Sequence, residues 1–477
     1  MVKRLIAVAV LCGVMLESSA RADEADMALR EQAAAALKRA ATYWRENVAS
    51  HGGYVYHYTL DLSRRWGEGE FTADTIFVQP PGTPTVGMAY LRAYEATGDH
   101  YYLDAAREAA EALVAGQLES GGWPQAIHFA PPTDGKRYGM YRKRPGGKWN
   151  TSSLDDGQTQ AAIEFLSQVD KALEFKHAEI HEATTYALDS LLAAQFPNGA
   201  FSQGWQAPAA DHPTVPAKYP DYEWKTERKL KEYWTLYTLN DGLAGSMART
   251  LRTAHEVYGD ERYKDALRRL GDFLLLAQMP EPQPAWCQQY NRDMTPAWAR
   301  KFEPPAITGS ESQDAVQTLI AIASYTGDER YLEPIPRAIR YFERSLLPDG
   351  RLARFYELRT NRPLYMDKDY RLTYDGSGAP GHYSWTAPSR LDRIAAAYEG
   401  AKAGKLDEKR PSLRSLRVAA SRGVEALDER GRWVATHGEG RVTGQPDFER
   451  GFQYLSSDLF SRNVIAISEY IEATEDQ

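Results

Sequence analysis

The sequence predicts an all-α fold, an α/α toroid of about six helical hairpins with long rim loops and a small β element. Three observations predict it: apolar residues recur at helical spacing in about twelve segments, a Gly-Asp pair recurs between neighbouring segments, and long loops separate the hairpins. We expect the first and last helices to meet, so that residues 23–477 form a single domain. The predicted helices begin near Ala28, Thr85, Tyr102, Gly157, His177, Gly242, Arg262, Gln313, Arg330, Ser389, Ser412 and Asp458.

The repeated Gly-Asp pair explains how a hairpin turns. Similar segments run through residues 90–123, 248–278 and 319–352. In each, the glycine fits the left-handed position that ends a helix, and the aspartate fits the N-cap of the next helix. The pairs are Gly98-Asp99, Gly259-Asp260 and Gly327-Asp328.

Four long loops follow second helices of hairpins, and we expect them to gather at one rim and form a cleft there. They cover residues 126–154, 202–240, 280–310 and 352–387. In the last loop, "RFYELRTNRPLY" and "YRLTYD" alternate in the manner of strands, which predicts a small sheet with Asn361 at a turn.

The N-terminus has the features of a secretory signal. A basic start, a short apolar run and the sequence Ala20-Arg21-Ala22 predict a signal peptide over residues 1–22, and hence a secreted or periplasmic protein. The apolar run is too short to span a membrane, so no membrane contact is expected after its removal. Cleavage would change the net charge from −8 to −10, because three basic residues and one glutamate are lost. No long basic block is present, which argues against nucleic acid as a partner. We expect a monomer.

Two acidic turns open helices in the same way. Asp155 and Asp156 precede one helix, and Asn240 and Asp241 precede another. One interpretation is helix capping, with Asp155 and Gln158 as a capping box and Asn240 or Asp241 as an N-cap. The other is that both turns converge on one hard cation, since Ca²⁺ prefers Asp and Asn oxygens. The sequence leaves both open.

Basic residues cluster in the loops just before both acidic turns, at residues 135–148 and 223–234. Such runs are typical of solvated loops. Alternatively, they form a groove for an acidic polysaccharide, in which arginines pair with carboxylates.

Four blocks of sequence resemble, in order, those of the family-ten pectate lyases, also called pectic acid lyases. They are "LDDGQTQAAIEFL", "YTLNDGLAGSM", "AWCQQYNRDMTPAWARKFEPPAITGSES" and "RFYELRTNRPLYMDKD". The similarity covers roughly residues 121–385. It implies a secreted, Ca²⁺-dependent pectate lyase that cleaves polygalacturonate by β-elimination, in a cleft at the loop face of an α/α toroid.

The resemblance also implies roles for individual residues. It implies that Lys368, Arg300 and Asp155 are catalytic, that Asp155, Asn240, Arg300, Arg362 and Tyr383 bind substrate, and that Asp156 and Asp241 bind Ca²⁺. Ca²⁺ and an arginine on the substrate carboxylate would stabilise the charge that develops when the neighbouring C5 proton leaves. Lys368 lies where the family shows an arginine proposed as the base, and it could lose a proton more easily than an arginine.

The sequence departs from the family pattern at three places. Lys368 replaces an arginine, Asp156 replaces an asparagine, and "GSGAPGHYSW" lacks two arginines found in relatives. Two alternative functions therefore stay open. One is an inverting glycoside hydrolase with Asp155 and Asp241 about 6.5–9.5 Å apart as acid and base. The other is a non-catalytic polyuronate-binding protein on the same toroid.

Overall fold

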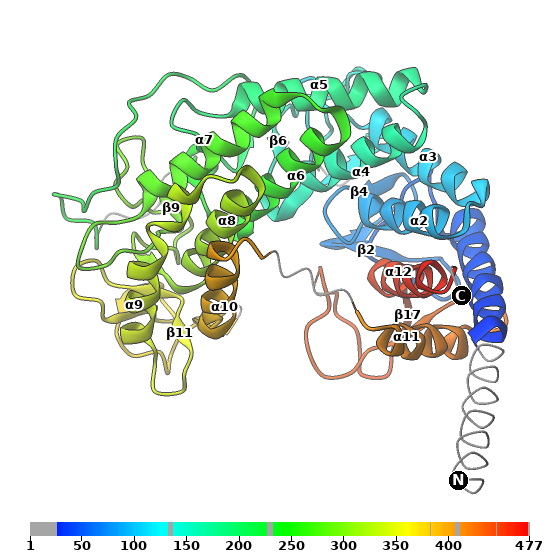
Figure 1. Ribbon diagram of the computed structural model, residues 1–477. Helices are drawn as coiled ribbons and strands as arrows, with labels where there is room; N and C mark the ends of the chain where they lie inside the picture. The colour runs from blue at the N-terminus through cyan, green and yellow to red at the C-terminus, as the bar shows by residue number, and fades with distance from the viewer. Residues whose placement is uncertain are drawn as a thin grey trace, which may run out of the picture. The chain divides into compact units, whose positions relative to one another are not determined.

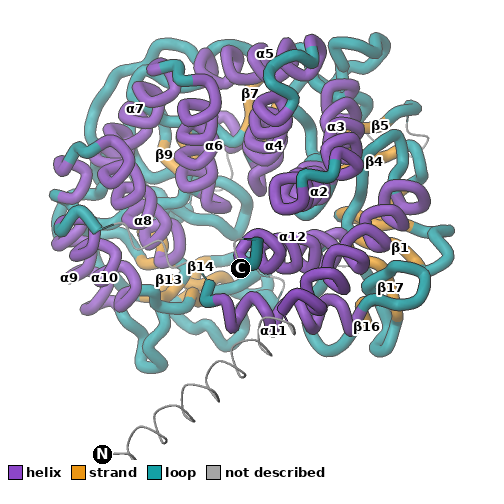
Figure 2. The backbone as a smooth tube through the Cα atoms, turned by 45° about the vertical axis from the view of Figure 1, so that its right-hand side comes forward, coloured by secondary structure: helices purple, strands orange, loops and turns teal. Residues whose placement is uncertain are grey.

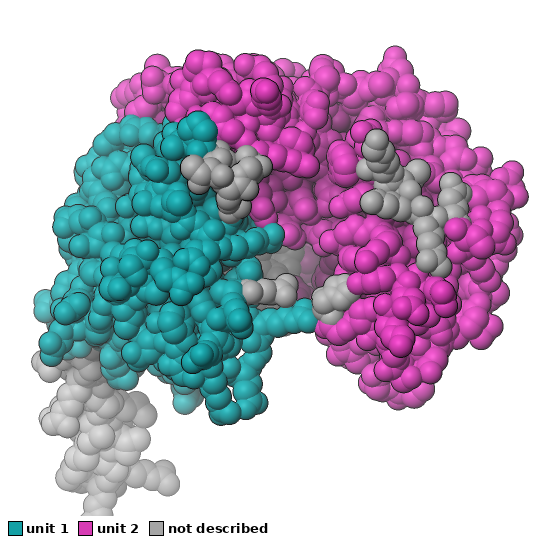
Figure 3. Space-filling model, turned by 180° about the vertical axis from the view of Figure 1, so that it is seen from behind, with its two compact units in different colours: residues 1–115, 126–133, 409–477 teal, residues 116–125, 134–408 magenta. Residues whose placement is uncertain are grey.

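The computed structural model describes residues 26–131, 137–226, 232–381, 383–405, 411–444 and 446–475. The chain forms two compact units, coloured teal and magenta in Figure 3. Unit 1 comprises residues 1–115, 126–133 and 409–477, and unit 2 comprises residues 116–125 and 134–408. The predicted signal peptide lies outside the described residues. The expectation of a single domain stays a prediction.

The all-α, α/α-toroid class predicted from the sequence is confirmed. The described residues are mostly helical, their helices pack in antiparallel pairs, and short strands occupy the connecting segments. All twelve predicted helices are present and begin within about five residues of the expected positions. Within the described ranges, no helix has both the length and the apolar character needed to cross a lipid bilayer.

Unit 1 brings the two ends of the described chain together. Its first helix covers residues 26–43, and its last is α12 (Ser457–Ala473). The Tyr470 hydroxyl donates a hydrogen bond to the Asp26 carboxylate at 2.9 Å, and the Trp44 ring stacks on Phe460 with centroids 4.4 Å apart. The predicted meeting of first and last helices is thus confirmed. The other helical segments of unit 1 are η1 (Trp44–Val48), α2 (Thr83–Thr97), α3 (His100–Ala115) and α11 (Leu413–Ala426).

The strands of unit 1 form a five-stranded antiparallel sheet and a separate pair. The sheet has the order β16-β17-β1-β2-β3, and the pair is β4-β5. Their bounds are β1 (His57–Thr59), β2 (Arg65–Gly67), β3 (Gly69–Phe71), β4 (Thr75–Phe77), β5 (Ala126–His128), β16 (Val434–Thr436) and β17 (Gln453–Ser456).

Unit 2 is built on three neighbouring helices that each follow a loop. Helices α4 (Gln158–Ala172), α6 (Leu243–Tyr258) and α8 (Gly309–Thr326) pack side by side in that order (Figure 1). Their small and apolar side chains, such as Ile163, Met247 and Leu319, are fully buried in the core. The remaining helices are α5 (Ala178–Ala194), α7 (Glu261–Ala277), η5 (Glu329–Leu332), α9 (Ile335–Ser345) and α10 (Leu391–Lys402).

The Gly-Asp pairs perform the predicted roles. Gly98, Gly259 and Gly327 are left-handed, with φ of 68°, 67° and 73°, and each backbone N–H closes the preceding helix. The aspartate after each glycine accepts a hydrogen bond from the backbone N–H two residues on. In unit 2, Gly259 ends α6 and Gly327 ends α8, and the chain turns at each glycine into the next helix.

Short antiparallel strand pairs tie the loops of unit 2 to one another. The pairs are β6 (Ser152–Ser153) with β7 (Gly204–Trp205), β8 (Tyr237–Thr238) with β9 (Gln289–Tyr290), and β11 (Leu352–Ala353) with β15 (Thr386–Ala387). A four-stranded sheet has the order β10 (Ile307–Thr308), β12 (Phe355–Tyr356), β13 (Pro363–Met366) and β14 (Leu372–Thr373).

The small sheet predicted around Asn361 is therefore confirmed, and Figure 2 shows β13 and β14 side by side. Asn361 lies between β12 and β13 with φ of 60°. In unit 2, the strands thus hold loop segments from distant parts of the chain beside the N-terminal ends of α4, α6 and α8.

Candidate metal centre

Two turns with the same backbone begin α4 and α6. They are the 3₁₀ turns η2 (Asp155–Gly157) and η4 (Asn240–Gly242). The middle residue of each is a left-handed aspartate, with φ of 45° at Asp156 and 54° at Asp241. The glycine that follows is also left-handed, with φ of 72° at Gly157 and 67° at Gly242. Left-handed non-glycine residues are strained, and such strain is concentrated at functional sites.

Hydrogen bonds place the two turns next to each other. The buried Gln160 amide donates to the Leu154 carbonyl, which precedes η2, at 2.9 Å, and to the Ser246 hydroxyl in α6 at 3.1 Å. The residue before each turn is fixed in an equivalent way: the Leu154 N–H donates to the carbonyl of Gln203, and the Leu239 N–H to that of Gln288. Gln203 directly precedes β7 and Gln288 directly precedes β9, so the loop segments that carry these strands determine where the turns lie.

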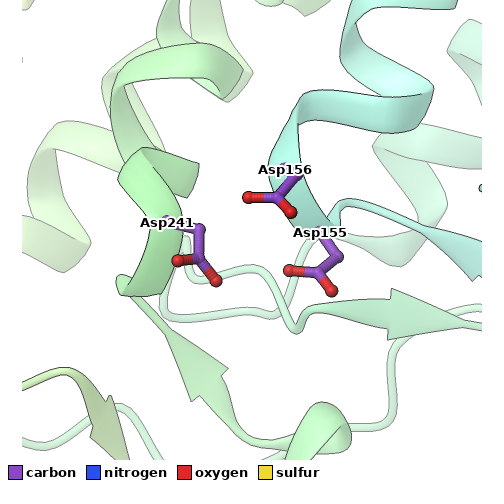
Figure 4. A group of neighbouring side chains, drawn as sticks. All are labelled: Asp155, Asp156 and Asp241. Carbon is purple, nitrogen blue, oxygen red and sulfur yellow. The ribbon is translucent and has the colours of Figure 1, made fainter. Parts of the chain in front are cut away.

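The carboxylates of Asp155, Asp156 and Asp241 form one cluster. One oxygen from each lies within 4.8 Å of the other two. Figure 4 shows Asp155 and Asp156 pointing from η2 toward Asp241 on η4. Three hard oxygen donors at this spacing match the ligands of a divalent cation such as Ca²⁺.

The capping interpretation of these residues is wrong. The N-caps of α4 and α6 are the left-handed glycines, and neither helix start has a side-chain capping hydrogen bond. Asp155 instead accepts a hydrogen bond from the Gln203 amide at 2.6 Å. The Asn240 amide donates to the Asp241 carboxylate. The acidic side chains are thereby left to face each other across the gap between the turns.

The electrostatics of the cluster favour neutralisation by a cation. Asp241 is an exposed residue, but many protein atoms surround its carboxylate. This burial, together with the charges of Asp155, Asp156 and Glu311, raises the pKa of Asp241 to about 8, although Arg300 works in the opposite direction. A carboxylate whose charge the protein does not balance is an effective ligand for a cation.

Arg300, predicted as a catalytic and substrate-binding residue, is held by Glu303. Its Nε and Nη2 donate to the two carboxylate oxygens at 2.8 and 2.5 Å, and its backbone N–H donates at 3.0 Å. Burial alone would raise the pKa of Glu303, but the Arg300 guanidinium lowers it. Tyr383, also predicted to bind substrate, donates its hydroxyl to Glu303 at 3.0 Å. The structure therefore brings Arg300 and Tyr383 together.

Sequence reasoning missed four residues beside the cluster. Gln203 orients Asp155. The pKa of the Tyr233 hydroxyl is raised by burial, and it is also influenced by Arg300, Glu303, Asp155 and Asp241, which places Tyr233 within their electrostatic reach. Glu311, 3% exposed, lies in the first turn of α8, and its Oε1 lies 3.5 Å from Nη2 of Arg354. The sequence around Arg354, "RLARFYELR", contains several arginines and gives no signal that distinguishes this one.

Lys368, predicted as the base, lies at the exposed tip between β13 and β14. Among the described residues it has no hydrogen-bond or ion-pair partner. Asp367 accepts hydrogen bonds from the backbone N–H groups of Asp369 and Arg371, so it stabilises the turn. Tyr370 packs on the loop that carries Arg300: its ring centroid lies 6.0 Å from that of Phe302 and 3.6 Å from the Lys301 ammonium.

Two further predicted substrate contacts lie in different environments. Asn240 is buried, at 4% exposure, and supports Asp241. Arg362 is exposed and stacks on Tyr374, whose hydroxyl donates to Glu357. Among the described residues, Arg362 has no hydrogen bond or ion pair with the carboxylate cluster, so its predicted role rests on the resemblance alone.

The basic loops are tied down by acidic partners where the structure describes them. Arg142 forms an ion pair with Glu182, and Lys143 lies 3.3 Å from Glu179, both partners being on α5. In the second loop, Lys225 pairs with the buried Glu357. Part of each loop, including Lys136 and residues 227–231, lies outside the described residues. For these cations the contacts favour anchoring of the loops over an open cationic groove.

Comparisons with known proteins agree with the family expectation. Residues 133–351 match the family model described as pectic acid lyase. The family 10 polysaccharide lyase from Cellvibrio cellulosa is 21% identical, with 66% of this chain and 95% of that chain covered and a TM-score of 0.46. A mutant of this lyase in complex with trigalacturonic acid is 19% identical, with 68% and 98% covered and a TM-score of 0.45.

A structure of cellobiose 2-epimerase from Spirochaeta thermophila is 16% identical, with 94% of this chain and 98% of that chain covered and a TM-score of 0.46. No curated protein matches the chain. The two acidic turns, Arg300 and Glu303 all fall inside the segment that the family model covers. Over residues 133–351 this chain is thus a match to the pectic acid lyase family, and the resemblance predicted from its sequence is confirmed.

Proposed function

We propose that the protein is a Ca²⁺-dependent pectate lyase that cleaves polygalacturonate by β-elimination. The observation that carries this proposal is the convergence of three carboxylates from two left-handed turns, within the segment that matches the pectic acid lyase family. We further propose that it acts as a secreted or periplasmic monomer on an acidic polysaccharide.

The residues present fit a calcium ion. Asp155, Asp156 and Asp241 supply hard oxygen donors within 4.8 Å of one another, and burial together with the neighbouring carboxylates raises the pKa of Asp241, which supports a cation there. Bound there, Ca²⁺ would act as a Lewis acid on a uronate carboxylate and lower the pKa of the neighbouring carbon acid.

Residues of the protein would stabilise the developing charge and accept the proton. β-Elimination removes the C5 proton and breaks the bond between C4 and its glycosidic oxygen, which leaves a 4,5-unsaturated uronate. Guanidinium groups near the cluster stabilise the negative charge that spreads onto the carboxylate as the proton leaves. Lys368, in its neutral form, is the proposed base that accepts the C5 proton.

The turn that carries Lys368 contacts the loop that carries Arg300. Tyr370, two residues beyond Lys368, contacts Phe302 and Lys301, and Arg300 adjoins them in the same loop. Because the Lys368 side chain has no carboxylate partner among the described residues, no ion pair has to break before it can approach a substrate.

The spacing of the carboxylates does not suit the alternative of an inverting glycoside hydrolase. An acid and a base that admit a water molecule stand about 6.5–9.5 Å apart. Asp155 and Asp241 have oxygens within 4.8 Å of each other, a distance that favours a shared cation.

The experiment is an ultraviolet absorbance assay for 4,5-unsaturated product on polygalacturonate, with Ca²⁺ and with a chelator, combined with mass spectrometry of the products. We expect absorbance that depends on Ca²⁺, and fragments whose summed mass equals that of the parent chain. Fragments heavier by one water, formed in the presence of chelator, would show hydrolysis. Binding of oligogalacturonides without turnover from acidic to alkaline pH would identify a non-catalytic binding protein.

A further inference from the structure

The two arginines beside the cluster differ in how many of their donors are occupied. Arg300 uses the Nε and Nη2 edge of its guanidinium on Glu303. This edge is the planar fork that would otherwise bind a carboxylate in bidentate fashion. Glu303 is 2% exposed, so a substrate carboxylate would have to displace a buried anion to take its place. Arg300 is therefore poorly prepared to grip a uronate with this edge.

In Arg354, by contrast, most of the guanidinium donors have no acceptor in the described part of the chain. Among the described residues, the one hydrogen bond of its side chain runs from Nη2 to Glu311, at 3.5 Å, and its buried Nε has no partner. A guanidinium has five N–H donors, and buried donors without acceptors are costly. The side chain is still 17% exposed, so a ligand can reach it.

The position of Arg354 is fixed by its neighbours. It lies between β11 and β12, where its backbone N–H donates to Trp385 and its carbonyl accepts from Gly309, at 2.8 and 3.1 Å. The guanidinium carbon lies 4.2 Å from the ring centroid of Tyr383, whose hydroxyl reaches Glu303. The Tyr383 side chain thus contacts the Arg354 guanidinium through its ring and Glu303, the partner of Arg300, through its hydroxyl.

We propose that Arg354 is a specificity-determining residue that binds a carboxylate of the polyuronate beside the cation cluster. This inference rests on the proposed function and deepens it. A ligand carboxylate would accept hydrogen bonds from the Nη1 and Nη2 donors, which are not among the buried unpaired atoms, and this charge-assisted bidentate contact would select a free carboxylate over its methyl ester.

If Arg354 has a purely structural role, a different result is expected. Glu311 is buried and one of its oxygens, Oε2, has no partner among the described residues, so Arg354 could serve only to offset that charge. In that case the variant Arg354→Ala would suffer because a buried carboxylate loses its counter-charge. The pair Arg354→Ala and Glu311→Gln separates the two roles, since the second change removes the charge that needs offsetting.

The test measures binding of trigalacturonate and of its methyl ester by calorimetry, at saturating Ca²⁺, for wild type, Arg354→Ala, Arg354→Lys and the double variant. Arg393→Ala, an exposed arginine on α10 with no partner among the described residues, is the matched control. Melting temperature and Ca²⁺ affinity are measured in parallel. Steady-state kinetics on polygalacturonate provide KM and kcat for each variant.

We expect Arg354→Ala to weaken trigalacturonate binding about tenfold or more, to raise KM, and to remove most of the preference for the acid over the ester. Ca²⁺ affinity should not fall. Arg354→Lys should keep the charge but lose the fork, with an intermediate defect. The double variant should regain melting temperature while its binding defect persists, and Arg393→Ala should match wild type.

Unchanged binding in Arg354→Ala, or recovery of binding in the double variant, would overturn the assignment of Arg354 and leave the proposed function in place. A wild-type protein that neither binds trigalacturonate nor yields unsaturated product would overturn both. The two failures are distinguishable because only the second affects the wild type.

Discussion

The turns η2 and η4 have the same backbone but different side chains. Each follows a short strand, each places a left-handed aspartate at its second position, and each ends in a left-handed glycine. In η2 the first residue is Asp155, which accepts a hydrogen bond from Gln203; in η4 it is Asn240, which donates to Asp241. The repeated backbone presents two carboxylates to one point, and the differing first residue decides how each is supported.

This comparison shows that Asp156 and Asp241 are equivalent in position but not in environment. Asp241 lies where burial and three other carboxylates oppose its charge, and its pKa is about 8. We therefore regard Asp241 as the principal ligand, whose charge a cation must balance, and Asp156 as the ligand that completes the set.

The largest effect is expected for Asp241→Asn, which removes the charge and keeps the shape. Ca²⁺ binding should be lost, and polygalacturonate cleavage should fall about a thousandfold, because Lewis-acid stabilisation of the reacting carboxylate is lost. Calorimetry and product absorbance measure the two quantities. Cleavage at the wild-type rate would show that Asp241 is not the principal ligand.

A variant outside both turns separates cation binding from proton transfer. Lys368→Ala should lower kcat about a hundredfold or more, the usual contribution of a general base, with Ca²⁺ affinity unchanged. Arg371→Ala, an exposed side chain on the same tip, is the control. Wild-type kcat in Lys368→Ala would remove the lysine from the mechanism, and the turns would keep their assigned role.

The role of Asp156 is tested by Asp156→Asn, which removes the charge of this ligand and keeps its shape. Ca²⁺ affinity should fall about tenfold, because one of three anionic ligands becomes neutral, and activity should return at high Ca²⁺ concentration. Loss as complete as in Asp241→Asn would mean that the two turns contribute equally.

The pH dependence of stability sharpens the same difference. With chelator present, the folded protein holds a proton on Asp241 up to a pKa of about 8, whereas the unfolded chain releases it near 3.8. The unfolded state is thus favoured increasingly as pH rises from about 4 to about 8. The melting temperature of wild type should fall relative to that of Asp241→Asn across this range, with the two converging at acidic pH.

Excess Ca²⁺ should reverse this loss for wild type, because a ligand that binds only the folded state stabilises it. A difference in melting temperature that does not change with pH would mean that Asp241 is ionised throughout.

Much of the fold was predictable, because local signals determine hairpins. A left-handed glycine followed by an aspartate both ends one helix and caps the next, so Gly259-Asp260 and Gly327-Asp328 could be placed from the sequence alone. The acidic turns were also visible. Whether they capped helices or met each other depends on Gln160 and on two-residue strands, which leave no periodic pattern.

The surroundings of the turns could not be predicted for the same reason. The occupation of Arg300 by Glu303 follows from a tight loop that brings residues three apart face to face. The approach of Glu311 to Arg354 joins the first turn of a helix to a residue between two strands, 43 residues later. Such pairings arise from tertiary packing, and neither residue type nor spacing marks them in advance.

We expect Asp156 and Asp241, on separate turns, to hold one cation together. Calcium titration by calorimetry of wild type, Asp156→Asn and Asp241→Asn tests this expectation. We expect one equivalent of Ca²⁺ per wild-type chain, with binding weakened by the first substitution and lost with the second. Two independent equivalents, or binding that neither substitution changes, would contradict it.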